Sequence, residues 1–150
     1  GIKLSAIYRP LNNIFLNPLM EKIRKEYICK HQIKKGIGGM KKLMSLKKEN
    51  FSTALMIDQR VSEGIFSNFF DQRALTTTIP AQLIKKFKIP VVPIHIQRNN
   101  GPNFKITIQK PIIFSEENSI QNITDKLNYV LENLIKIKPE QWIWSHNRWK

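Results

Sequence analysis

The sequence has 150 residues, enough for one domain, and a formal net charge of +14 from 25 basic and 11 acidic residues. This charge balance indicates anionic partners, namely nucleic acid, anionic lipid or an acidic protein. A hydrophobic fraction of 41% excludes a disordered basic tail, and the single cysteine, Cys29, excludes an intrachain disulfide. No apolar run reaches the roughly 18 residues of a membrane span.

The first third of the chain predicts a strand, a helix, a basic loop and a second helix. Residues 2–8 alternate apolar and polar side chains, which is typical of a strand. Residues 13–28 repeat apolar side chains at helical spacing, with Asn17 as the expected cap. The glycine-rich stretch 31–39 predicts a loop, and residues 40–48 return to helical spacing.

The middle of the chain predicts two buried strands and a short helix. Residues 53–57 and 91–96 are apolar runs, which are typical of strands covered on both faces. Between them, residues 60–78 are expected to be irregular. Residues 79–87 predict a helix that has proline at its first position.

The last third predicts a hairpin followed by a long helix. Residues 104–108 alternate as a strand, expected to pair with residues 91–96 across the turn Asn99-Asn-Gly-Pro102. Residues 119–137 follow the spacing of an amphipathic helix. The whole pattern predicts an α/β fold with a mixed, mostly parallel sheet, flanking helices and a C-terminal hairpin plus helix.

Three charged side chains follow the predicted strands: Arg9 after the first, Asp58 after the second and Arg98 after the third. Ligands of open α/β sheets bind at the carboxyl ends of parallel strands, so we expect these side chains to bind substrate. A planar guanidinium suits phosphate, and Asp58 would orient an arginine or hold a substrate hydroxyl. The alternative is a structural ion pair between Arg9 and Asp58.

The histidines lack the partner that a general base needs. In a His-x-x-x-x-Asp/Glu dyad, the acid lies five positions after the histidine and orients it. Neither His31 nor His95 has such an acid, and the chain ends before that position for His146. Because no histidine shares zinc-ligand spacing with a cysteine or acid, the sequence predicts no metal and no cofactor. Residues 34–39 are glycine-rich but follow no predicted strand, so they are at most a weak phosphate-contact loop.

The C-terminal sequence Pro139-Glu-Gln-Trp-Ile-Trp-Ser-His-Asn-Arg-Trp-Lys150 holds all three tryptophans, which are expected to lock the chain end onto the sheet. Together with Tyr8-Arg-Pro-Leu-Asn-Asn13, Asp58-Gln59 and Val91-Val-Pro93, it resembles the lauroyl/myristoyl acyltransferases of lipid A biosynthesis. These motifs occur in the family's order along nearly the whole chain. Asp71 departs from the pattern, since the family has glycine there.

The resemblance implies a glycerolipid-acyltransferase-like fold and an O-acyltransferase at the cytoplasmic face of the bacterial inner membrane. Such an enzyme moves a fatty acyl chain from acyl carrier protein to a phosphorylated lipid A precursor. The family's His-x-x-x-x-Asp/Glu dyad and membrane anchor precede its Tyr-Arg-Pro motif. Residues 1–150 are therefore expected to be the C-terminal half of a single acyltransferase domain, incomplete, without catalytic residues of its own and inactive alone.

Residues 22–48 hold ten Lys and Arg against one acid, Glu26. We expect this segment to face an anionic membrane surface or the acidic carrier protein. One alternative function is a basic nucleic-acid-binding module, but the usual sequence signatures of such modules do not occur, so we expect no nucleic-acid partner. A second alternative is a non-catalytic remnant that binds anionic membrane.

Overall fold

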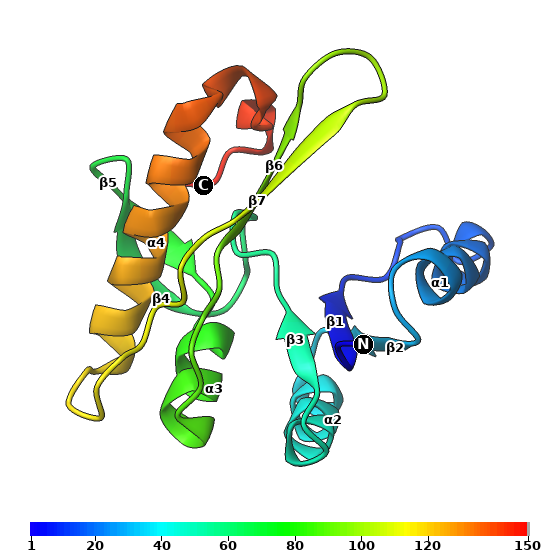
Figure 1. Ribbon diagram of the computed structural model, residues 1–150, viewed down its shortest axis with the longest axis horizontal. Helices are drawn as coiled ribbons and strands as arrows, with labels where there is room; N and C mark the ends of the chain where they lie inside the picture. The colour runs from blue at the N-terminus through cyan, green and yellow to red at the C-terminus, as the bar shows by residue number, and fades with distance from the viewer. Residues whose placement is uncertain (150) are drawn as a thin grey trace. The chain divides into compact units, whose positions relative to one another are not determined.

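The computed structural model describes residues 1–149, which form two compact units, Gly1–Met56 and the part that begins at Ile57 (Figure 1). Each unit has its own sheet and its own helices. The mixed α/β class expected from the sequence is confirmed, with the strands divided among three small sheets.

The first unit is a three-stranded parallel sheet with two helices. Its elements are β1 (Leu4–Tyr8), α1 (Leu16–Tyr27), β2 (His31–Lys34), α2 (Ile37–Lys48) and β3 (Ser52–Ala54). The strand order is β2-β1-β3, and Ser5 of the central strand pairs with His31 on one side and Thr53 on the other. Ile33 of β2 and Leu43 of α2 are buried and form the centre of this unit's core.

The basic stretch 31–39 is not the loop that its glycines predict. Its first residues form β2, and α2 begins at Ile37. A Cβ atom at Gly39 would overlap the carbonyl oxygen of Lys34. Glycine is therefore required at position 39 for the close approach of α2 to β2.

The start of α1 also differs from expectation, because Asn13 and not Asn17 caps the helix. Asn13 Oδ1 accepts hydrogen bonds from the backbone N–H groups of Phe15 and Leu16, at 3.0 and 3.1 Å. Asn17 lies inside the helix, where its side chain is available for a different contact. Asn13 thus satisfies two of the N–H groups that have no acceptor within the helix at its start.

The second unit contains two antiparallel hairpins and two α-helices (Figure 1). Its elements are β4 (Ile65–Phe69), β5 (Gln72–Thr76), α3 (Ile79–Phe87), β6 (Ile94–Arg98), β7 (Phe104–Ile108), α4 (Ile120–Ile137) and the 3-10 turns Pro139–Gln141 and Trp144–His146. α4 packs on β4 and on α3. Ala81 and Ile84 of α3 meet Ile123 and Leu127 of α4 in a buried apolar cluster.

The expectation that residues 60–78 are irregular is wrong, since β4 and β5 form a hairpin there. Phe70 and Asp71 make its turn with φ of 50° and 58°, both in the left-handed region. Aspartate adopts this region more readily than most residues, so it can stand where glycine is usual. The turn residues do not form an Asn-Gly or Asp-Gly pair, the sequence signal that usually predicts such a hairpin.

The two apolar runs do not form strands covered on both faces. β3 comprises only Ser52–Ala54 at the edge of its sheet, and Met56 beyond it is 75% exposed. β6 begins at Ile94, after the proline that cannot donate to a ladder, and pairs antiparallel with β7 alone. An apolar run does not determine which elements pack on it. Both strands lie at sheet edges.

The hairpin turn and the long helix are confirmed. Asn99 N–H donates to Asn103 O at 2.9 Å, which closes the turn between β6 and β7. Ser119 caps α4: its side chain accepts from the Asn122 backbone, and the Asn122 side chain accepts in return from the Ser119 N–H. The regular apolar stripe predicts this helix, and the structure adds the reciprocal cap that fixes its start.

Candidate functional site

Tyr8, at the carboxyl end of β1, anchors a polar network in the first unit. Its hydroxyl donates a hydrogen bond of 2.6 Å to Glu21 Oε1 of α1. Asn17 Nδ2 donates to the same oxygen at 2.8 Å, and Lys34 Nζ at the end of β2 lies 3.2 Å away. The network thus joins α1 to the carboxyl ends of two parallel strands.

The network changes the acidity of both partners. The hydrogen bonds from Tyr8, Asn17 and Lys34 hold the pKa of Glu21 down at about 2, so it is an anion at any physiological pH. Burial, with the bond to Glu21 second, raises the pKa of Tyr8 to about 12, so its hydroxyl stays protonated. Neither group serves as a proton-transfer residue near neutral pH.

Arg9, the first predicted site residue, follows Tyr8 directly and is exposed. Within residues 1–56, no hydrogen bond or ion pair engages its guanidinium, and it does not belong to the Tyr8 network. An exposed arginine beside the carboxyl edge of a parallel sheet is free to bind an anionic ligand.

A cavity of about 460 Å³ opens at this same edge of the sheet. Its walls are the ends of β1 and β2, the start of α2 and one side of α1. The lining residues are Tyr8, Glu21, Lys25, Gln32, Ile33, Lys34, Lys35, Gly36, Gly38, Gly39 and Lys42. The glycine-rich stretch therefore does follow a strand, contrary to the expectation from the sequence.

Asp58, the second predicted site residue, lies in the second unit and is half-buried. Its Oδ1 atom is fully enclosed and has no hydrogen-bond partner among residues 57–149. The same is true of Nε of Arg148, a side chain only 2% exposed. Burial lowers the pKa of Arg148, and the Asp58 carboxylate acts in the opposite direction by stabilising its charge.

Arg148 is the important residue that sequence reasoning missed. Its guanidinium donates to the carbonyl oxygen of Leu75 and to Thr76 Oγ1, and it lies 5.4 Å from the centre of the Phe69 ring. A basic residue near a chain end normally faces solvent. Its place in the C-terminal motif, between His146 and Trp149, was the signal available in the sequence.

Arg98, the third predicted site residue, is the last residue of β6. Because β6 pairs antiparallel with β7, the argument from parallel strand ends does not apply to it. Its backbone N–H and carbonyl are both bonded by the Gln141 side chain, at 2.9 and 2.8 Å, and its guanidinium lies over the Phe104 ring. No hydrogen bond or ion pair joins Arg98 to Asp58 within residues 57–149.

The C-terminal tryptophans pack on the β4–β5 hairpin as expected. Trp142 and Trp149 contact the buried Phe69 ring, with ring centres 5.8 and 5.7 Å apart. Trp149 Nε1 also donates to the carbonyl oxygen of Phe69 at 2.9 Å. Trp144 lies at the edge of the cluster and is 46% exposed, so it contributes less buried area.

The described part of the chain has neither a metal-binding cluster nor a membrane-spanning helix. Residues 1–149 contain no group of three or more His, Cys, Asp or Glu side chains placed to hold a metal ion. None of the helices described here combines the length and the apolar character needed to cross a bilayer.

Comparison with known proteins identifies the family. No curated protein matches the chain. The family model of the bacterial lipid A biosynthesis acyltransferases, in contrast, matches residues 1–150. The chain therefore belongs to the bacterial lipid A biosynthesis acyltransferase family.

Proposed function

We propose that the protein transfers a fatty acyl chain from acyl carrier protein to a hydroxyl of a phosphorylated lipid A precursor, at the cytoplasmic face of the bacterial inner membrane. The observation that carries the proposal is the family match over residues 1–150. The motifs at Tyr8, Asp58 and the C-terminus, which resemble those of the family, support the same substrate class. In the structure Arg9 is exposed, and Asp58 is half-buried with one enclosed oxygen.

In the proposed reaction, residues 1–150 bind and orient substrate while a His-x-x-x-x-Asp/Glu dyad acts from outside them. The dyad histidine takes the proton of the acceptor hydroxyl, whose oxygen attacks the thioester carbonyl. The carbon–sulfur bond breaks, an ester forms, and the carrier thiolate receives the proton. We propose that residues 1–150 are the C-terminal half of one acyltransferase domain, because no histidine in them has an acid five positions on.

Arg9 is proposed to contact a phosphate or sugar oxygen of the acceptor, and Asp58 and Arg98 are proposed as further substrate-binding residues. Arg9 is suited to this because it is exposed and free of protein partners within its unit. Asp58 is suited because it is half-buried and one of its oxygens is enclosed without a hydrogen-bond partner among residues 57–149. Arg98 is the least supported, since its backbone and guanidinium both serve local contacts.

The proposed membrane contact is the outer side of α1. The helix attaches to its sheet by polar side chains, since Glu21 bonds Tyr8 and Arg24 lies 5.0 Å from the Tyr8 ring centre. Its apolar side faces outward: Phe15 is 86% exposed and Leu19 is 55% exposed. Exposed lysines flank this face, as in helices that lie in the interface of anionic bilayers.

The test of the proposed function is acyl transfer by residues 1–150 joined to a dyad-bearing N-terminal segment of the same family. With labelled acyl carrier protein and a phosphorylated lipid A precursor, transfer is expected. Arg9→Ala should raise the KM for the acceptor, while Arg60→Ala, which removes another exposed arginine, should not. A folded protein that transfers acyl groups to no such acceptor would refute the proposal.

A further inference from the structure

The cavity at the carboxyl edge of the parallel sheet has a strong excess of positive charge. Among the described residues, its lining holds four lysines, Lys25, Lys34, Lys35 and Lys42, and one carboxylate, Glu21. These lysines come from three different elements, α1, β2 and α2, and the segment between them. The fold therefore brings cations that are far apart in sequence to one hollow.

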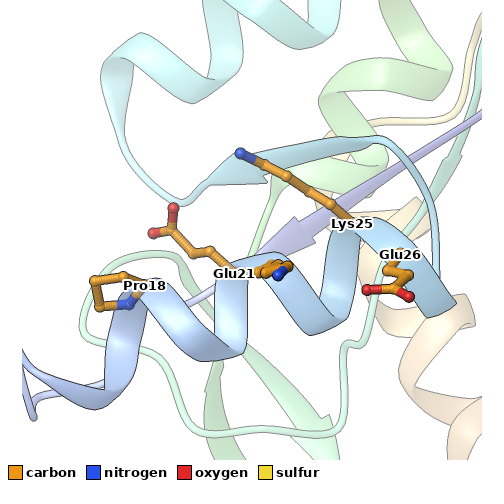
Figure 2. A pocket seen from close by; sticks show the side chains of 5 residues that line it. Pro18, Glu21, Lys25 and Glu26 are labelled. Atoms are coloured by element: carbon orange, nitrogen blue, oxygen red, sulfur yellow. The ribbon is translucent and has the colours of Figure 1, made fainter.

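A hollow on α1 provides a contrast. It measures about 470 Å³ and is lined by Pro18, Glu21, Lys22, Lys25 and Glu26, so its acids and lysines balance. Figure 2 shows Glu21 and Lys25 rising from one side of α1 while Glu26 points away. The two hollows share Glu21 and Lys25, but only the one at the strand ends adds Lys34, Lys35 and Lys42 without a further acid.

The one acid in the cavity is already engaged. Glu21 accepts hydrogen bonds from Tyr8 and Asn17, and it pairs with Lys34. Within residues 1–56, no carboxylate pairs with the remaining lysines of the cavity, Lys25, Lys35 and Lys42. Like charges gathered in a hollow repel one another, so an anion bound there would relieve a cost that the free protein bears.

The cavity wall also exposes backbone donors. A Cβ atom built at Gly36 or Gly38 would meet nothing within 4 Å, so a ligand can approach the chain there without obstruction. The first N–H groups of α2 have no acceptor within the helix, and no side chain caps them. These donors add to the lysines, whose ammonium groups are strong ligands for phosphate.

We propose that this cavity is a binding site for the phosphate group of a phosphomonoester, held by Lys35, Lys42 and the glycine-lined backbone at the start of α2. A phosphomonoester has up to two negative charges and three acceptor oxygens, which match several convergent cations and N–H groups. This site is separate from the acceptor contact proposed for Arg9, which does not line the cavity.

The test is a titration of the ¹⁵N-labelled chain with inorganic phosphate at constant ionic strength, followed at the amide signals of Gly36, Gly38 and Gly39. Saturable shifts of these signals are expected. Lys35→Gln/Lys42→Gln should weaken binding about tenfold or more, as expected for the loss of a charge-assisted hydrogen bond. The control Lys41→Gln/Lys48→Gln removes equal charge from exposed positions of the same helix and should change affinity less than about twofold.

Two further ligands distinguish the source of the phosphate. Equal affinity for inorganic phosphate and monomeric short-chain phosphatidic acid means that the phosphate alone is recognised, whereas tighter binding of the lipid assigns the site to a lipid headgroup. Equal weakening by both variant pairs, or no shift at the glycine amides of the wild-type chain, overturns the proposal. The titration needs no acyl transfer, so its outcome is independent of the function proposed above.

Discussion

Arg148 Nη2 donates a hydrogen bond of 2.9 Å to Thr76 Oγ1, joining residues 72 positions apart. The arginine is almost fully enclosed, and the nearby Asp58 charge opposes the lowering of its pKa by burial. The C-terminal motif is thereby tied to β5. We regard this link as the means by which the chain end organises the second unit.

Arg148→Met should therefore destabilise the second unit by about 3 kcal/mol, because it leaves the enclosed Asp58 oxygen and the Leu75 carbonyl without a compensating cation. Urea unfolding followed by tryptophan fluorescence measures this loss. Arg60→Met, at an exposed position, should change stability little. In a double-mutant cycle with Asp58→Asn, a coupling energy near zero would show that Asp58 is not the counter-charge of Arg148.

The tryptophans of the tail should contribute unequally to stability. Trp149→Ala removes packing on Phe69 and a hydrogen bond to its carbonyl, so a cost of about 3–5 kcal/mol is expected. Trp144→Ala should cost clearly less, because this side chain is 46% exposed. Thermal unfolding of the two variants side by side checks the order. Equal losses would mean that the cluster acts as one cooperative unit.

The Tyr8–Glu21 bond should make the first unit sensitive to acid. The pKa of Glu21 is lowered from 4.5 to about 2, so its contribution to stability is fully present above pH 4.5 and is lost as the pH falls toward 2. Glu21→Gln should remove this part of the pH dependence between those limits. Glu26→Gln, which removes an exposed carboxylate on the same helix, serves as the control. Parallel acid-unfolding curves for wild type and Glu21→Gln would contradict the assignment.

At alkaline pH the effect of pH on stability has the opposite sign, because stability falls as the pH rises. Because the pKa of Tyr8 is raised from 10.0 to about 12, folding favours the protonated phenol. Its contribution is present below pH 10 and declines as the pH rises toward 12. Tyr8→Phe should flatten this decline.

Vesicle binding tests the outer face of α1. Binding to vesicles with anionic lipid is expected to weaken with salt, since each Lys or Arg near such a surface contributes about 1 kcal/mol. Phe15→Ser/Leu19→Ser should reduce it strongly. Ile106→Ser/Ile108→Ser, which removes exposed apolar side chains of β7, should not. Equal binding to neutral vesicles, or binding to acidic carrier protein without any to vesicles, would contradict an anionic lipid surface.

Elements with local sequence signals could be predicted. Elements whose structure depends on burial by other elements, or on contacts distant in sequence, could not. The helix at residues 119–137 is confirmed because its regular apolar stripe is a local signal. The β4–β5 hairpin was missed because Phe70 and Asp71 adopt the left-handed region without glycine. The apolar residues 91–96 predict a buried strand, but a strand is buried only where other elements cover it. β6 pairs with one strand, β7.

The candidate site shows the same division. The motif residues Arg9 and Asp58 could be selected from their positions after apolar runs. The lysine cavity could not be predicted, because it depends on β2. The glycines that follow β2 led to the prediction of a loop there. The burial of Arg148 depends on contacts with residues more than 70 positions earlier, a relation that no local pattern contains.

Residues 1–150 alone are expected to transfer no acyl groups and to self-associate. No histidine among them has an acid five positions on, so the acceptor hydroxyl has no base of the expected kind. The β6–β7 hairpin also exposes five large apolar side chains, each more than half accessible: Ile94, Ile96, Phe104, Ile106 and Ile108. An uncovered apolar ribbon with free edges favours association between copies.

Light scattering and an acyl-transfer assay test both statements on the same preparation. Co-expression with a dyad-bearing N-terminal segment should first reduce association and then, where the two segments dock correctly, restore transfer. Ile94→Lys/Ile106→Lys should reduce association without creating activity, because the added charges break the apolar ribbon but supply no base. A preparation of residues 1–150 that is monomeric, unfolds cooperatively and transfers acyl groups unaided would refute both the missing base and the uncovered surface.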